Sequence, residues 1–156
     1  TVRVWDLSID PPRPVLEQSG LQARGLSLSP KGNRLAVQRA DGSVTIIEPG
    51  MAPRHLREAA GALRVAFTRS GDQLITRDRT AALKVWQVAT GALARLISTE
   101  VEGDGPLWAS EDRVLLLVNG AVHSWSLATG EHLHSGCAQR TDGLLHRCAV
   151  QSLLAR

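Results

Sequence analysis

The chain has 156 residues, 43% of them hydrophobic and 21% charged, which is enough to bury a core and typical of a globular protein. Its net charge of +3 comes from 18 basic and 15 acidic residues that are interspersed along the sequence. This distribution argues against nucleic-acid binding, and no apolar run approaches the length of about 18 residues that a membrane-spanning helix needs.

The first predicted strand, at 1–7, reads TVRVWDL and alternates polar and apolar residues. Such alternation is typical of a half-buried β-strand. An outer strand is expected near 14–17. Because the sequence begins within a strand and without methionine, we expect residues 1–18 to be the third and outer strands of a structural unit whose first two strands are absent.

The same alternation returns three times along the chain, as GSVTIIE, AALKVWQ and GAVHSWS. The aligned aromatic or apolar positions are Trp5, Ile47, Trp86 and Trp125. Residue numbers 5, 47, 86 and 125 differ by 42, 39 and 39, so the sequence contains an internal repeat of about forty residues. The segments that follow these strands repeat too: VATGALARL, at 88–96, resembles LATGEHLHS, at 127–135.

Each unit contains short alternating runs separated by turn residues, as strands joined by tight turns do. The dipeptides Asp41-Gly42 and Asn119-Gly120 stand at the turn before the third run, where positive φ angles favour such pairs. Four short antiparallel strands in about forty residues form one blade of a β-propeller. We therefore predict an all-β propeller with about four blades' worth of chain, in these units: full blades at 21–58, 61–98 and 104–136, and the start of a further blade at 143–156.

On these motifs the chain resembles WD-repeat β-propellers over nearly its whole length. Trp5-Asp6 retains the literal Trp-Asp pair, and the other three units carry degenerate versions. The family's Gly-His pair before the innermost strand is missing in every unit. The Asp position of the family's buried hydrogen-bond network is held by Asp41, Thr80 and Asn119. The resemblance therefore implies blades that depend more on apolar packing than on that network.

Two segments also allow a helical interpretation. Residues 55–67 and 144–156 contain good helix formers with apolar residues at helical spacing. We prefer strands in both, because the repeat register places inner strands at 63–68 and about 145–149.

The ends of the chain allow two arrangements. In the first, the chain is part of a larger propeller whose remaining blades lie outside this sequence. In the second, the C-terminal strands pair with residues 1–7 and complete one blade from both termini, which would cover exposed strand edges. We favour the first.

No metal site is predicted, although two groups contain ligand-type residues: His132, His134 and Cys137, and His146 with Cys148. His132 and His134 are expected on an outer strand, and His146 and Cys148 on the next blade's inner strand, at opposite radial ends. Cys137 is expected in the loop between, within reach of only one of these groups. A disulfide between Cys137 and Cys148 stays open, but two reduced thiols are the preferred interpretation.

No catalytic or cofactor site is predicted either. The sequence has no nucleophile elbow, phosphate-binding loop or HExxH motif. The loop EVEGD, at 100–104, holds three carboxylates and is interpreted as a solvated connection between blades.

A docking surface is predicted where the turns between second and third strands meet the loops that enter the inner strands. Arginine is common at interface hot spots, and the three acids of the 100–104 loop would complete a mixed-charge rim. The proposed partner-binding residues are Arg39, Arg77, Arg79, Glu100, Glu102 and Asp104.

The predicted function is a non-catalytic scaffold or sensor that mediates protein–protein interaction within a larger signalling or regulatory protein. The resemblance implies a protein partner or an attached effector domain: a kinase, a signalling NTPase or a protease-like domain. A cytoplasmic location and a bacterial origin are expected. The alternatives are an enzyme with its active site in the central channel and a purely structural subunit of an assembly.

Overall fold

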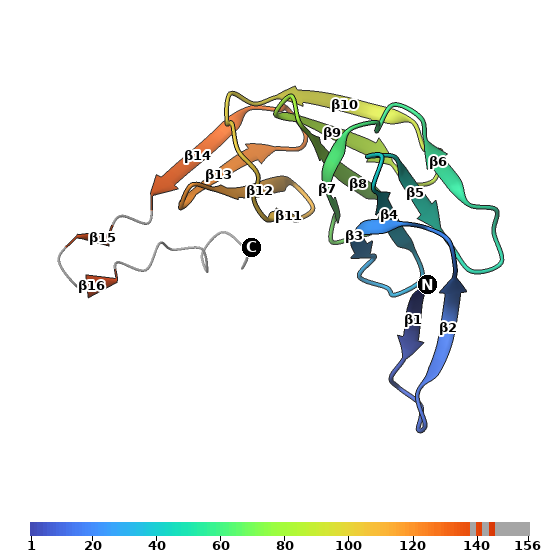
Figure 1. The fold of residues 1–156 in the computed structure, drawn as a ribbon. Coiled ribbons are helices and arrows are strands. Elements are labelled where there is room, and N and C mark those ends of the chain that lie inside the picture. The colour runs from blue at the N-terminus through green and yellow to red at the C-terminus, as the bar shows by residue number, and fades with distance from the viewer. Residues whose placement is uncertain (138–139, 142–143, 146–156) are drawn as a thin grey trace.

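The structure is a computed structural model that describes residues 1–137, 140–141 and 144–145, and every regular element in them is a β-strand. Three four-stranded antiparallel sheets follow one another along an arc, with the two-stranded sheet β1–β2 beside the first (Figure 1). The predicted all-β fold of four-stranded blades is confirmed.

Each four-stranded sheet is a simple up-and-down meander and forms one blade. The two-stranded sheet contains β1 (Val2–Asp6) and β2 (Arg13–Gln18). The first blade contains β3 (Ala23–Leu28), β4 (Leu35–Arg39), β5 (Val44–Ile47) and β6 (Arg54–Leu56). The second contains β7 (Ala62–Phe67), β8 (Gln73–Asp78), β9 (Ala82–Gln87) and β10 (Leu93–Ser98). The third contains β11 (Leu107–Ala109), β12 (Arg113–Val118), β13 (Ala121–Ser126) and β14 (His132–Cys137).

The helical alternative for 55–67 is wrong. This segment comprises the end of β6, a turn and β7, because β6 pairs with β5 and β7 pairs with β8. Beyond β14, a short pair is formed by β15 (Arg140–Thr141) and β16 (Leu144–Leu145). Apart from 144–145, the predicted further blade at 143–156 lies outside the described residues, and so does the closure of the two ends.

The repeat register of the sequence corresponds to equivalent places in the blades. Ile47, Trp86 and Trp125 stand on the third strands and pair with Leu35, Leu74 and Val114 at the start of the second strands. All six side chains are buried. Trp5 stands on β1 at the matching position and is 50% exposed, because β1 pairs only with β2 in the described structure.

The core consists of layers between successive blades. Alternate residues of a strand point to opposite faces, so the middle strands of each blade contribute to two layers. On β8, Leu74 packs toward the first blade and Ile75 toward the third. Trp86 is buried in the layer between the first and second blades, and Trp125 in the layer between the second and third. Each blade therefore buries its apolar faces by stacking on its neighbours.

The turns before the third strands follow the predicted chemistry in two different ways. Asn119 and Gly120 both have positive φ, 51° and 77°, and form a two-residue hairpin loop between Val118 and Ala121. The loop at Asp41-Gly42 has four residues, 40–43, between β4 and β5, and only Gly42 among them has positive φ. A Cβ atom at Gly42 would lie 2.6 Å from the backbone of Gly61, so this position requires glycine for space as well as for φ.

Part of the buried hydrogen-bond network typical of WD-repeat blades is present in the second blade. The indole Nε1 of Trp86 donates to Thr76 Oγ1 on β8 over 2.9 Å, and both groups are buried. In the third blade the position of Thr76 is held by Leu116, which joins the apolar layer with Trp125. The expectation of apolar packing without that network therefore describes the third blade better than the second.

Candidate functional site

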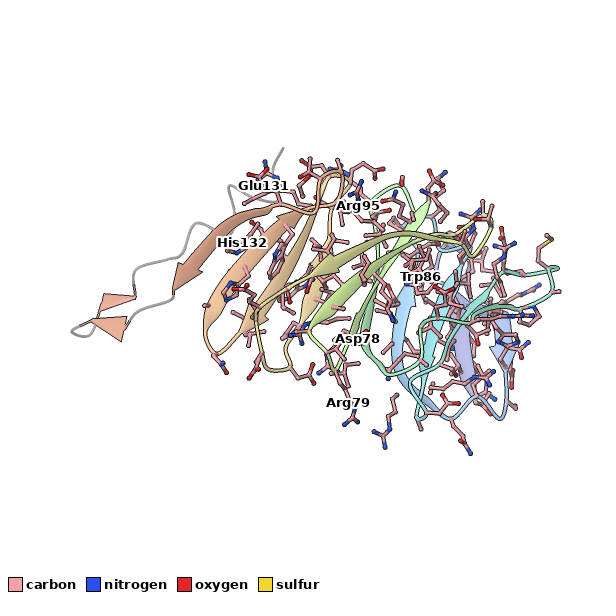
Figure 2. All side chains as sticks on the ribbon, turned by 90° about the horizontal axis from the view of Figure 1, so that it is seen from above. Asp78, Arg79, Trp86, Arg95, Glu131 and His132 are labelled. Carbon is pink, nitrogen blue, oxygen red and sulfur yellow. The ribbon has the colours of Figure 1, made fainter. Side chains whose placement is uncertain are left out.

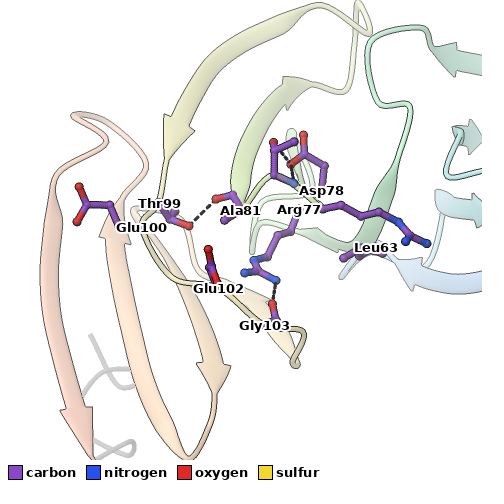
Figure 3. A pocket seen from close by; sticks show the side chains of 10 residues that line it. Leu63, Arg77, Asp78, Ala81, Thr99, Glu100, Glu102 and Gly103 are labelled. Carbon is purple, nitrogen blue, oxygen red and sulfur yellow. Dashed lines mark hydrogen bonds between the residues drawn. The ribbon is translucent and has the colours of Figure 1, made fainter.

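The turn between β8 and β9 lies at one edge of the blades, beside the connection that links the second blade to the third. Figure 2 shows Asp78 and Arg79 at this edge and Arg95 and Glu131 at the opposite one. A cleft of about 560 Å³ opens between the turn and the connection. Its lining includes four of the six predicted partner-binding residues, namely Arg77, Arg79, Glu100 and Glu102. Figure 3 labels Arg77, Glu100 and Glu102 among the lining residues.

Arg77 holds the two sides of this cleft together. Its side chain comes from the end of β8 and is 1% exposed. The guanidinium donates through one NH₂ group to the carbonyl oxygen of Val101, over 2.7 Å, and through the other to that of Gly103. Burial lowers the pKa of Arg77, against the opposing effect of the nearby Asp104 and Asp78 carboxylates. Arg77 as a partner contact stays a prediction; in the structure its charge is used inside the protein, where it holds the connection in place.

Arg39, another predicted partner-binding residue, does not stand at the position equivalent to Arg77; Gln38 does. Gln38 pairs with Val44, and Arg77 pairs with Leu83, each three residues before the repeat-defining third-strand position. Gln38 is buried and donates to the carbonyl oxygen of Ala62 over 2.9 Å, so it ties β4 to β7. Arg39 points to the opposite face, since a shift of one residue on a strand reverses the side chain. It does not line the cleft.

Asp78 stabilises the turn at the cleft mouth and stands two residues before Thr80, which occupies the family's Asp position in the sequence. One carboxylate oxygen accepts hydrogen bonds from the backbone N–H groups of Thr80 and Ala82 and from the Thr80 hydroxyl. Burial alone would raise the pKa of Asp78, but these hydrogen bonds and Lys84 hold it below its ordinary value. The turn therefore presents Arg79 from a rigid base.

The remaining predicted residues are exposed on the connection between blades. Glu100 and Glu102 line the cleft opposite Arg79. Asp104 forms an ion pair with Arg64 at 2.7 Å, on the side of β7. Thr99 anchors the start of the connection, because its hydroxyl donates to the carbonyl oxygen of Ala81. The cleft thus offers side chains of both signs on a backbone fixed at Thr99, Val101 and Gly103.

A second cleft, of about 350 Å³, lies on the other side of the same connection. Three aromatic rings of the third blade meet there, none of which the sequence had singled out as a cluster. The ring of His123 stacks on Trp125 with centroids 5.9 Å apart, and His132 lies 5.1 Å from Trp125. Glu100 faces both clefts. The sequence could have indicated part of this cluster, because His123 and Trp125 are two residues apart on one strand and therefore share a face.

The imidazole of His123 is expected to titrate below its ordinary pKa of 6.5, because it is partly buried and faces His132. The unfolded chain then binds a proton that the folded chain resists, so the free energy of unfolding falls as the pH drops below about 6.5. His123→Phe should flatten this dependence relative to the unmodified chain, as measured by urea unfolding at pH 7 and 5.5. An NMR pKa of His123 at or above 6.5 would contradict the expectation.

In the part of the chain that the structure describes, no group of three His, Cys, Asp or Glu side chains could hold a metal ion. The side chains of His134 and Cys137, and all of His146 and Cys148, lie outside the description, so neither the metal prediction nor the disulfide alternative is tested. Among the described residues, no helix is long and apolar enough to cross a membrane.

Comparison with known proteins identifies the fold. No family model matches the chain. A stretch of 61 residues is 39% identical to coronin-7 of Bos taurus, and this is 39% of the present chain and 7% of that protein. The WD40 repeats of RRP9 superimpose with a TM-score of 0.64 and 13% identity, over 79% of this chain and 41% of theirs.

Two further solved structures superimpose in the same way. U3-55K gives a TM-score of 0.65 at 14% identity, over 81% of this chain and 42% of that one. Hydrazine synthase of Kuenenia stuttgartiensis gives 0.59 at 16% identity, over 77% and 37%. The chain therefore has the WD-repeat β-propeller fold, as the resemblance predicted. It spans less than half the length of each of these chains.

Proposed function

We propose that the chain is a non-catalytic interaction module that docks a protein partner in the mixed-charge cleft between its second and third blades. The fold supports the proposal, since propellers present variable loops on a rigid scaffold. The observation that carries it is the cleft itself, where Arg79, Glu100 and Glu102 are exposed around a floor fixed by Arg77.

The charge distribution of the cleft favours a segment of folded or extended protein over a small anionic ligand. Arg77 already bonds two carbonyl oxygens, and Asp78 is paired with Lys84 at 3.3 Å. The side chains left for a partner are one arginine and two glutamates. A partner that offers both signs at matching positions would satisfy all three, and mismatched charges would exclude other proteins.

We propose that the chain is part of a larger signalling or regulatory protein in the bacterial cytoplasm. That protein would supply the remaining blades of the propeller and an attached effector domain: a kinase, a signalling NTPase or a protease-like domain. The propeller would regulate this domain.

The inner strands support a non-catalytic role over a channel enzyme. In a propeller these strands line the central channel, where an enzyme would gather titratable groups. The described inner strands β3, β7 and β11 read ARGLSL, ALRVAF and LWA, with neither His nor carboxylate. Their exposed side chains include the apolar Leu26, Leu28 and Trp108.

Charge reversal at the cleft is expected to remove the partner. Extract from the source cells is passed over the immobilised chain carrying Arg79→Glu and Glu102→Lys, and recovered proteins are quantified against the unmodified chain. We expect at least a tenfold loss of the partner, because two desolvated charge pairs are replaced by repulsion. Lys31→Glu is the matched control, since Lys31 is exposed on the β3–β4 turn at the other end of β4. Equal recovery with the double variant would overturn the proposed docking site.

A further inference from the structure

We propose that the second cleft, bounded by Glu100, His123, Trp125 and His132, binds the guanidinium group of an arginine side chain from the partner protein. The inference deepens the proposed function and rests on it, because the two clefts share Glu100 and one partner would occupy both. The cleft of about 350 Å³ lies at the lower end of the range of about 300–1,000 Å³ found for ligand pockets, which suits one long side chain.

The second blade contains an internal cation at the equivalent place. Lys84 stands two residues before Trp86, as His123 stands two residues before Trp125, so both point toward the preceding blade. The Lys84 ammonium donates to the carbonyl oxygen of Glu58, over 2.8 Å, in the segment that follows the outer strand of that blade. It also lies 3.3 Å from the carboxylate of Asp78. Neighbouring blades of this chain therefore accept a cation between them at this position.

The third blade lacks that cation and leaves the space open. His123 is shorter than lysine, and its lowered pKa keeps it neutral near pH 7. Its Nδ1 is buried and makes no hydrogen bond within the described residues. The position of Asp78 is held by Val118, so a carboxylate for the cation must come from elsewhere. Glu100 supplies it, since it lines the cleft, is exposed and forms no ion pair with any described residue.

The aromatic rings favour guanidinium over ammonium. A guanidinium is planar, stacks on aromatic faces and can bind a carboxylate through two parallel hydrogen bonds, whereas an ammonium is a compact and strongly hydrated charge. In this cleft, His132 projects from the outer strand β14 (Figure 2) and lies 5.9 Å from His123, beside Trp125. An arginine could place its methylene stem against these rings and its charged end at Glu100.

The test is an NMR titration of the 156-residue chain with the blocked tripeptide Gly-Arg-Gly. We expect saturable shifts at the Trp125 indole and at the His123 and His132 rings. Blocked Gly-Gln-Gly should give no saturable shifts, and Gly-Lys-Gly should bind more weakly. Equal shifts with the glutamine peptide, or equal affinity for the lysine peptide, would overturn a guanidinium site.

Three variants locate the site. Glu100→Gln should weaken binding of the arginine peptide about tenfold, the effect of losing one charged hydrogen-bond partner. Glu58→Gln is the matched control, because Glu58 is an exposed glutamate in the corresponding connection after the first blade and lines neither cleft, so this variant should bind as the unmodified chain does. His123→Lys should give the third blade an internal cation equivalent to Lys84 of the second blade, and it should abolish binding of the arginine peptide. Undiminished binding by Glu100→Gln or His123→Lys would contradict the proposal.

The tripeptide titration does not use the cellular partner, so its outcome is separate from that of the charge-reversal experiment. If charge reversal removes the partner but the chain does not bind the arginine peptide, the proposed docking cleft is supported and the proposed arginine site is overturned.

Discussion

Replacing Trp86 by alanine is expected to lower the free energy of unfolding by about 3–5 kcal/mol, which is enough to unfold much of the chain at 37 °C. The side chain is 1% exposed and lies in the apolar layer between the first and second blades. The substitution opens a cavity that the rigid strands on both sides cannot close, and it leaves the Thr76 hydroxyl without its Trp86 donor. Urea unfolding followed by circular dichroism measures the change.

The repeat provides a matched control for this experiment. Trp125→Ala should be nearly as destabilising, because Trp125 is 3% exposed in the next layer. Trp5→Ala should lower the free energy of unfolding by less than about 1 kcal/mol, because the side chain of Trp5, at the equivalent position, is already half exposed. A similar loss for Trp5 and Trp86 would mean that position in the repeat, and not burial between blades, determines the effect.

The second large effect is expected at Arg77. Arg77→Ala should lower the free energy of unfolding by about 2–4 kcal/mol, because the carbonyl oxygens of Val101 and Gly103 lose a buried donor, at about 1–3 kcal/mol each. Part of this loss is offset, since a guanidinium that burial disfavours is also removed. Amide hydrogen exchange should accelerate at residues 101–105 before the rest of the third blade.

Arg79→Ala is the control for Arg77→Ala. The two arginines are separated by one residue, but Arg79 is exposed and its removal should change stability by less than about 0.5 kcal/mol. In the docking experiment the two arginines act for different reasons. Arg79 contacts the partner directly, whereas Arg77 holds the connection between the blades in place. Unchanged hydrogen exchange in Arg77→Ala would show that the connection does not depend on this side chain.

The architecture could be predicted from the sequence because its period is carried by residues with a strong local preference. Trp86 and Trp125 mark the buried end of a third strand, and Asn119-Gly120 favours a hairpin whatever surrounds it. Alternation along each strand then identifies the two buried faces. These signals are local, so they survive even where the family's Gly-His pair is missing.

The candidate site could be predicted only in part, because it depends on register and on a loop. Arg39 and Arg77 both stand near the turn between second and third strands, but Gln38 and not Arg39 is the structural equivalent of Arg77. Burial of Arg77 depends on the path of residues 99–104, which no repeat dictates. The sequence therefore indicated the edge of the blades where the first cleft lies and the exposed charges around it, but it revealed neither the burial of Arg77 nor the second cleft.

The most direct test of the stacked-blade account is 19F NMR of the chain with all four tryptophans replaced by 5-fluorotryptophan. The change of each resonance between H₂O and D₂O measures how far that ring is exposed to solvent. We predict large changes for Trp5 and Trp108, which are 50% and 48% exposed, and almost none for Trp86 and Trp125. A change at Trp86 or Trp125 as large as that at Trp5 would contradict the burial of these side chains between successive blades.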